Sequence, residues 1–132
     1  MSNDSTRELP VFKKAQEVVR LTIAVAGALR KREDSPTEPG MLVEFAGTLG
    51  AKIRGAEAVP FYTLKLENAF EIKIAARYLK AQIGMIRSLE MIEPEYADLV
   101  LDAIEAFRIE FLAWVNSFDP SHDSQDEWWF SC

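Results

Sequence analysis

The sequence predicts an all-α fold, an antiparallel up-down-up-down four-helix bundle with an aromatic C-terminal tail. Apolar residues recur every three or four positions in four long segments, which is the spacing of amphipathic helices. Short polar segments with proline or glycine separate these four, and none has the alternating pattern of a strand. The chain has 132 residues, 48% of them hydrophobic, so it can bury a core as one domain. Short connections place successive helices antiparallel.

The first helix is expected over residues 9–32, after a polar leader at residues 1–8. Phe12, Val19 and Leu29 belong to its apolar stripe. The basic triplet at its end, residues 30–32, suits the negative end of a helix dipole, and the alternative is a phosphate contact. The following segment, residues 33–40, holds two prolines and a glycine and is predicted to be a loop.

The second helix, expected over residues 39–58, contains Gly47, Gly50 and Gly55. Each glycine costs about 1 kcal/mol relative to alanine inside a helix, so three of them need a physical reason. We expect a neighbouring backbone to approach this smooth strip closely. The alternative, a phosphate-binding loop, lacks both a preceding strand and a glycine-lysine pattern.

The third helix, expected over residues 61–90, is the longest and would measure about 45 Å. It carries two apolar stripes, and a helix with so much apolar circumference is buried on more than one side. One stripe is predicted to face the core: Leu66, Phe70, Ile74, Tyr78, Ala81, Met85 and Leu89. The other is predicted to be a subunit interface: Leu64, Ile72, Leu79, Ile83 and Ile86.

Four basic residues, Lys73, Arg77, Lys80 and Arg87, share the remaining sector of this helix and form a candidate surface for an anionic partner. The alternative is that they pair with an acidic stripe on the fourth helix, in the same subunit or the next. That stripe consists of Glu95, Asp98, Asp102 and Glu105. Exposed pairs of this kind contribute at most about 1 kcal/mol each.

The fourth helix is expected over residues 94–118, because Pro94 suits a first helical turn. The tail, residues 119–132, is acidic and ends in an aromatic group, Trp128, Trp129 and Phe130. Three exposed aromatic side chains would form a costly patch, so we expect them to dock on this subunit or a neighbour. The alternative is a disordered terminus.

Histidine and cysteine, two residue types that often carry catalysis or bind metals, are scarce. Cys132 is the only cysteine and His122 the only histidine, and both lie in the tail. A di-metal site in a bundle needs Glu-x-x-His pairs on its helices, and the sequence has none. We therefore predict no catalytic residue, no metal ligand and no cofactor, and expect the protein not to be an enzyme.

The net charge of −6 disfavours nucleic acid as a partner without excluding it, because nucleic-acid-binding proteins usually carry a basic surplus. The start of the chain lacks the apolar core of a signal peptide, and no apolar run has the length of a membrane span. We expect a cytoplasmic protein without a membrane partner.

Helix order and lengths over residues 9–118 resemble those of a bacterial four-helix-bundle family. Its members were first noticed as products of intervening sequences in large-subunit ribosomal RNA genes, and it includes accessory proteins of diversity-generating retroelements. The resemblance rests on FKKAQEVV in the first helix, Glu71-Ile72 in the third and MIEPEYADLVLDAIEAF at the start of the fourth. In the second helix, Leu49 and Ile53 fit the family's Ile-Pro-x-Asn-Ile-Ala-Glu-Gly stretch, whereas Gly50 and Lys52 stand at its Pro and Asn positions.

The resemblance implies a small cytosolic bundle without known catalytic activity, and in several members a ring of five subunits. Retroelement accessory members work with a reverse transcriptase and nucleic acid. The expected function is therefore a non-enzymatic homo-oligomeric scaffold or adaptor, in the form of a pentameric ring. The alternative is a nucleic-acid-binding accessory protein.

Overall fold

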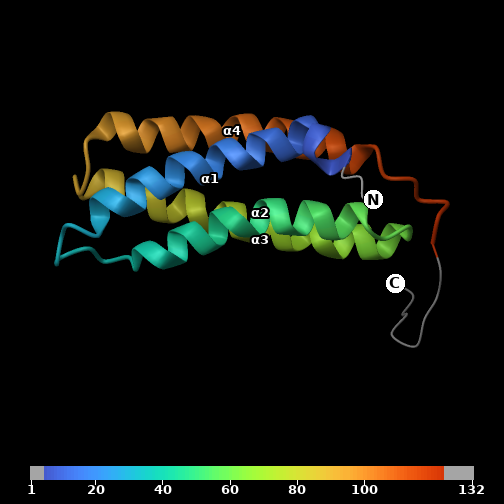
Figure 1. The fold of residues 1–132 in the computed structure, drawn as a ribbon, viewed down its shortest axis with the longest axis horizontal. Coiled ribbons are helices and arrows are strands. Elements are labelled where there is room, and N and C mark those ends of the chain that lie inside the picture. Colours follow the sequence, from blue (N-terminus) through green and yellow to red (C-terminus); the bar gives the residue numbers. More distant parts are fainter. Residues whose placement is uncertain (1–4, 124–132) are drawn as a thin grey trace.

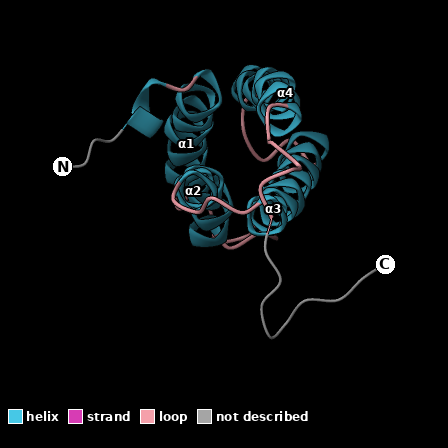
Figure 2. Ribbon diagram, turned by 90° about the vertical axis from the view of Figure 1, so that its right-hand side faces the viewer, coloured by secondary structure: helices cyan, strands magenta, loops and turns pink. Residues whose placement is uncertain are grey.

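Four α-helices lie side by side and alternate in direction (Figure 1). The computed structural model describes residues 5–123 of the chain. Its helices are α1 (Pro10–Leu29), α2 (Pro39–Glu57), α3 (Tyr62–Ser88) and α4 (Pro94–Asn116), after a short 3₁₀ helix at Ser5–Glu8. Each helix packs on its neighbours in sequence, and α4 closes the bundle against α1 (Figure 2). The predicted four-helix bundle is confirmed, with helix ends within three residues of the expected ones.

Proline marks the start of three of the four helices. The first turns of α1, α2 and α4 contain Pro10, Pro39 and Pro94, respectively. Proline fits there because its fixed φ is helical and the amide hydrogen that it lacks would have no partner inside the helix. These prolines therefore set the helix starts that the sequence predicted.

A Schellman motif ends α3, and it uses a glutamate where glycine is usual. Glu90 has a positive φ of 56°, the left-handed conformation that follows many helices. Its amide donates to the Arg87 carbonyl at 3.0 Å, and the Met91 amide donates to the Ile86 carbonyl at 3.1 Å. At this turn the chain reverses direction toward α4, and the Met91 side chain just beyond it is buried.

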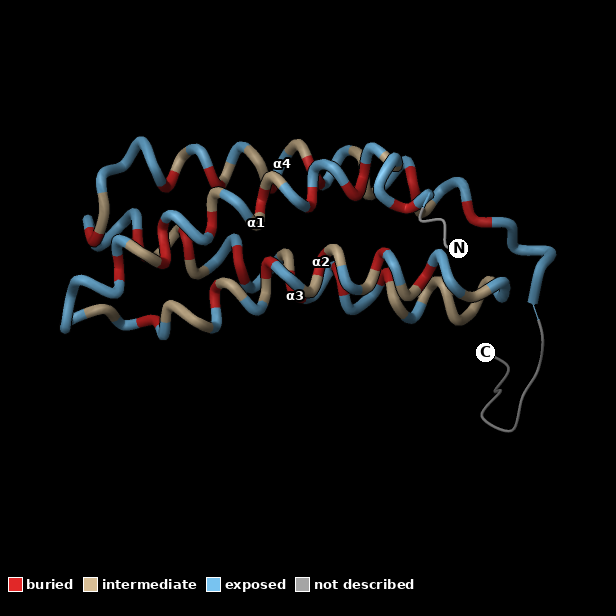
Figure 3. Tube along the Cα trace, viewed as in Figure 1, coloured by how far each residue is buried: buried red, intermediate tan, exposed pale blue. Residues whose placement is uncertain are grey.

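The core lies along the axis of the bundle, where the inward sides of all four helices meet (Figure 3). Branched aliphatic side chains dominate it, together with the ring of Phe107. The largest completely buried residues are Val11, Val18, Leu29, Leu42, Leu49, Ile53, Ile72, Leu79, Ile83, Ile86, Val100 and Phe107.

The glycines of α2 accommodate side chains, so the prediction of a close backbone approach is wrong. A Cβ at Gly50 would lie 3.3 Å from the ring of Phe12, and one at Gly55 would lie 2.8 Å from the Asn68 side chain. Nothing lies within 4 Å of the Cβ position at Gly47. Gly50 and Gly55 therefore make room for a neighbouring side chain, on α1 and α3 respectively.

Polar contacts fix the end of the described chain against the start of α3. The Tyr62 amide donates to the His122 carbonyl at 2.6 Å, and the Thr63 hydroxyl donates to the Asp123 carboxylate at 2.6 Å. Nearby, the Trp114 indole donates to the Glu57 carboxylate at 2.8 Å. The predicted docking group, Trp128, Trp129 and Phe130, lies outside the described residues.

Candidate functional site

The two apolar stripes of α3 face the opposite ways to those predicted: the stripe expected at an interface is buried, and the stripe expected in the core is largely exposed. Ile72, Leu79, Ile83 and Ile86 are completely buried by the other helices of the same chain, and Leu64 is half-buried. The prediction that this stripe is a subunit interface is therefore wrong, because its members already form the core. Both stripes have helical spacing, and spacing alone does not identify the inward one.

The outward stripe of α3 carries an apolar row, the α3 ridge, formed by Phe70, Ile74 and Tyr78. These side chains are 60%, 55% and 56% exposed and lie four residues apart, so they follow one another on successive turns. The Tyr78 ring stacks on Phe45 of α2, with 5.7 Å between the ring centroids. This contact holds Tyr78 in place at one end of the ridge.

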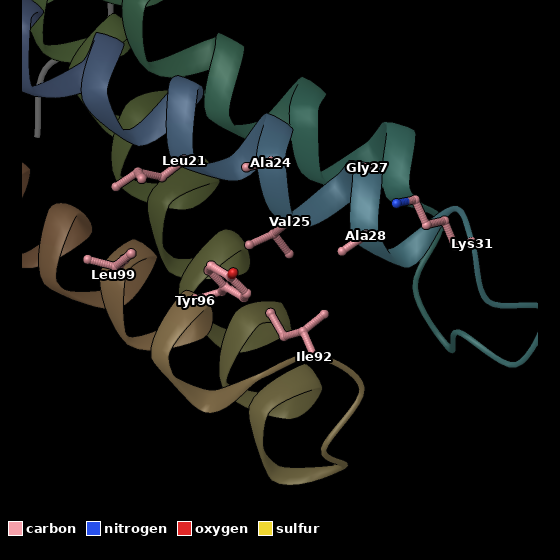
Figure 4. Close-up of a pocket in the computed structure, with 9 residues that line it drawn as sticks. All are labelled: Leu21, Ala24, Val25, Gly27, Ala28, Lys31, Ile92, Tyr96 and Leu99. Atoms are coloured by element: carbon pink, nitrogen blue, oxygen red, sulfur yellow. The ribbon is translucent and has the colours of Figure 1, made fainter.

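A second apolar surface is the α1–α4 groove, a pocket of about 490 Å³ between these two helices (Figure 4). Tyr96 and Leu99 of α4 are 56% and 50% exposed. Opposite them α1 contributes small residues, and nothing lies within 4 Å of a Cβ at Gly27. The groove is lined by Leu21, Ala24, Val25, Gly27, Ala28, Lys31, Ile92, Tyr96 and Leu99.

The groove was not predicted from the sequence. Its signal was the run of small residues Ala24, Gly27 and Ala28 on one face of the first helix. Other exposed large apolar residues lie outside both surfaces: Ile23, Met41, Phe61, Leu89, Ile109 and Leu112.

The basic sector of α3 is partly neutralised by α4 of the same chain. Arg87 pairs with Asp98 at 2.7 Å between Nε and Oδ1, and this hydrogen bond lowers the pKa of the Asp98 carboxyl. The pKa of Glu105 is lowered chiefly by its hydrogen bond to Arg108, with a smaller contribution from the charge of Lys80. The predicted pairing within one subunit is thus confirmed for Arg87.

Lys73 and Arg77 are exposed, and neither makes an ion pair with another residue in the range 5–123. Asp102 of α4 is likewise exposed and outside the ion pairs of this range. Lys80 and Glu95 are also exposed and outside these ion pairs, so five residues of the two sectors predicted to pair remain unpaired within residues 5–123. An anionic partner would therefore find three unpaired basic side chains on α3, those of Lys73, Arg77 and Lys80, and not four.

Groups of His, Cys, Asp and Glu that could hold a metal ion do not occur among residues 5–123. In the same range, no helix combines the length and apolar character that crossing a membrane requires. His122 is exposed at the end of this range, with its ring nitrogen 3.7 Å from the Asp119 carboxylate.

Comparison with known proteins gives no match: no family model, curated protein or solved structure is significantly similar to this chain. The resemblance to the intervening-sequence family stays a prediction. The surfaces themselves are the basis for the functional proposal.

Proposed function

We propose that this protein is a non-enzymatic scaffold that assembles from several copies of its own bundle. One observation carries the proposal: a single chain leaves two separate apolar surfaces uncovered, the α3 ridge and the α1–α4 groove. Large apolar patches on a protein surface mark sites of association, because water contact with them is unfavourable. Both surfaces are built on rigid helices, so they are already formed before a partner binds.

A ring of five copies is the assembly that we propose, since the family resemblance implies it. A closed ring covers the apolar surfaces of every copy, whereas an open chain leaves one of each exposed at its ends. A scaffold of this kind would present the polar faces of its helices to other molecules.

The test is the mass of the full-length protein in solution, measured by light scattering and by sedimentation across a range of concentrations. One chain weighs 14.9 kDa, so assembly gives a multiple of this value that is constant at high concentration. A mass of one chain at the highest concentration reached would overturn the proposal.

Binding of nucleic acid is the rival function, and the same preparation tests it. Phosphate contacts weaken steeply with salt, so binding to RNA or DNA that is strong at low salt and lost at high salt would favour the rival. The scaffold proposal expects no such binding, because the net charge is −6 and Arg87 is already paired.

A further inference from the structure

We propose that the contact between copies is heterologous: the α3 ridge of one copy inserts into the α1–α4 groove of the next. This inference rests on the proposed self-assembly and specifies which surfaces meet. Three features support it, namely the shapes of the two surfaces, their positions on the bundle and the charges beside them.

The ridge and the groove match in shape and length. Phe70, Ile74 and Tyr78 form a row spaced by four residues, the kind of ridge that packs between the rows of other helices. The row spans about 12 Å, and the segment of α1 from Leu21 to Lys31 along the groove spans about 15 Å. The small side chains of Ala24 and its neighbours leave space for large ones from outside (Figure 4).

The two surfaces lie on different sides of the molecule. Viewed along the bundle, α3 stands diagonally across from α1 and its outward side faces away from the groove (Figure 2). One copy can therefore use its ridge and its groove at the same time, with two different neighbours. A heterologous contact of this kind produces a closed ring or an open filament.

Charges favour this pairing over contact between two ridges. Lys73 and Arg77 flank the ridge, so two ridges facing each other would bring like charges together. Glu95 and Asp102, beside Tyr96 and Leu99 of the groove, are exposed and acidic.

The basic and acidic residues also match in spacing. Lys73 and Lys80 are seven residues apart on α3, as Glu95 and Asp102 are on α4. Seven residues of helix span about 10 Å, so both pairs of opposite charges come close when the helices lie antiparallel. Parallel helices would also bring opposite charges together, with the partners exchanged, so the spacing favours this register of the contact, and the antiparallel direction is the one that charge reversal at Lys73 and Asp102 tests.

Two full-length variants with complementary defects test the inference. The ridge variant carries Phe70→Gln and Ile74→Gln, and the groove variant carries Gly27→Gln and Leu99→Gln. All four positions are partly or fully exposed, and glutamine is a good helix former, so both variants should keep the helical signal in circular dichroism. The matched control carries Gly47→Gln and Ile109→Gln, an open glycine and an exposed α4 residue outside both surfaces.

The expected result is that each variant alone has the mass of one chain, while an equimolar mixture has the mass of two chains. The mixture has one intact ridge and one intact groove, so assembly stops at a heterodimer. The control should assemble like the unaltered protein.

Two outcomes would overturn the inference while leaving self-assembly in place. In the first, the groove variant assembles like the unaltered protein, which would mean that ridges pair with each other. In the second, replacing Trp128, Trp129 and Phe130 with serine abolishes assembly while the ridge variant still assembles, which would make the tail the occupant. A monomeric unaltered protein would instead remove the proposed function itself.

Discussion

The Thr22 hydroxyl is buried in the core side of α1, and its Oγ1 has no hydrogen-bond partner among residues 5–123. An unsatisfied buried hydroxyl costs about 1–3 kcal/mol, because it has lost water without gaining a partner. Thr22→Val replaces the hydroxyl with a methyl group of similar size. We expect the free energy of unfolding in urea to rise by about 1–2 kcal/mol.

Thr48→Val is the matched control for this change. The Thr48 hydroxyl donates to the Glu44 carbonyl at 2.9 Å, so its removal should not stabilise the protein. If the two substitutions changed the free energy of unfolding equally, the Thr22 hydroxyl would have a hydrogen-bond partner in solution.

The ion pair of Arg87 with Asp98 makes a pH-dependent contribution to stability. Its hydrogen bond lowers the pKa of Asp98 below the ordinary aspartate value of about 4. Because the folded pKa is depressed, the contribution is complete above the unfolded pKa and is lost as pH falls through the folded pKa.

In Arg87→Gln we expect the carboxyl titration of Asp98, followed by carbon NMR, to move up toward the ordinary value. The stability difference between this variant and the unaltered protein should be present at neutral pH and vanish in strong acid. Arg108→Gln serves as the control, since it should raise the pKa of Glu105 and leave Asp98 in place. If the pKa of Asp98 were the same in Arg87→Gln as in the unaltered protein, the result would contradict the pairing.

At the level of the helices, the sequence predicts existence and extent well and orientation poorly. Pro39 and Pro94 mark helix starts through a local effect on the backbone, so they can be read without the fold. The inward side of α3 depends on how α2 and α4 pack against it, which is a tertiary property. Leu79 and Ile74 have similar sequence surroundings, yet Leu79 is completely buried and Ile74 is 55% exposed.

The α1–α4 groove could not be predicted from the sequence, because it too depends on how the helices pack. Gly27 and Ala28 look like ordinary helix residues, and they line a hollow only because Tyr96 and Leu99 of α4 stand opposite. Likewise, Glu90 gives no glycine signal for the end of α3, although its backbone is left-handed. Features made by two distant segments need the fold before they can be recognised.

The orientation of α3 predicts a large loss of stability for one truncation and almost none for another. Leu79→Ala should lower the free energy of unfolding by about 2–5 kcal/mol, because it opens a cavity in the core. Ile74→Ala should change it by no more than about 0.5 kcal/mol, because the side chain is 55% exposed and loses little contact with its own chain. Urea unfolding at low protein concentration is the measurement, since assembly then contributes least. A larger loss from Ile74→Ala would restore the orientation first predicted.

For the whole molecule, exposed apolar area and surface charge contribute differently to the proposed assembly. In the proposed assembly, the ridge and the groove supply the apolar area that makes association favourable, whereas the flanking charges select which surfaces meet. The acidic excess of the chain raises the cost of bringing copies together, so local opposite charges at the contact matter more at low salt.

The charges on the two sides of the contact predict a rescue experiment. In the proposed contact with antiparallel helices, Lys73→Glu or Asp102→Lys alone places like charges together between copies. Either change should weaken assembly, by about two- to tenfold in dissociation constant for rim charges. Combining both substitutions in one chain restores opposite charges with reversed sign, so assembly should return toward that of the unaltered protein. Sedimentation equilibrium at low salt measures these constants, and high salt should shrink all differences through screening. Lys73→Glu combined with Asp34→Lys is the control, because Asp34 pairs with Arg32 in the loop after α1. A double variant no tighter than either single one would mean that Lys73 does not meet Asp102 across the contact.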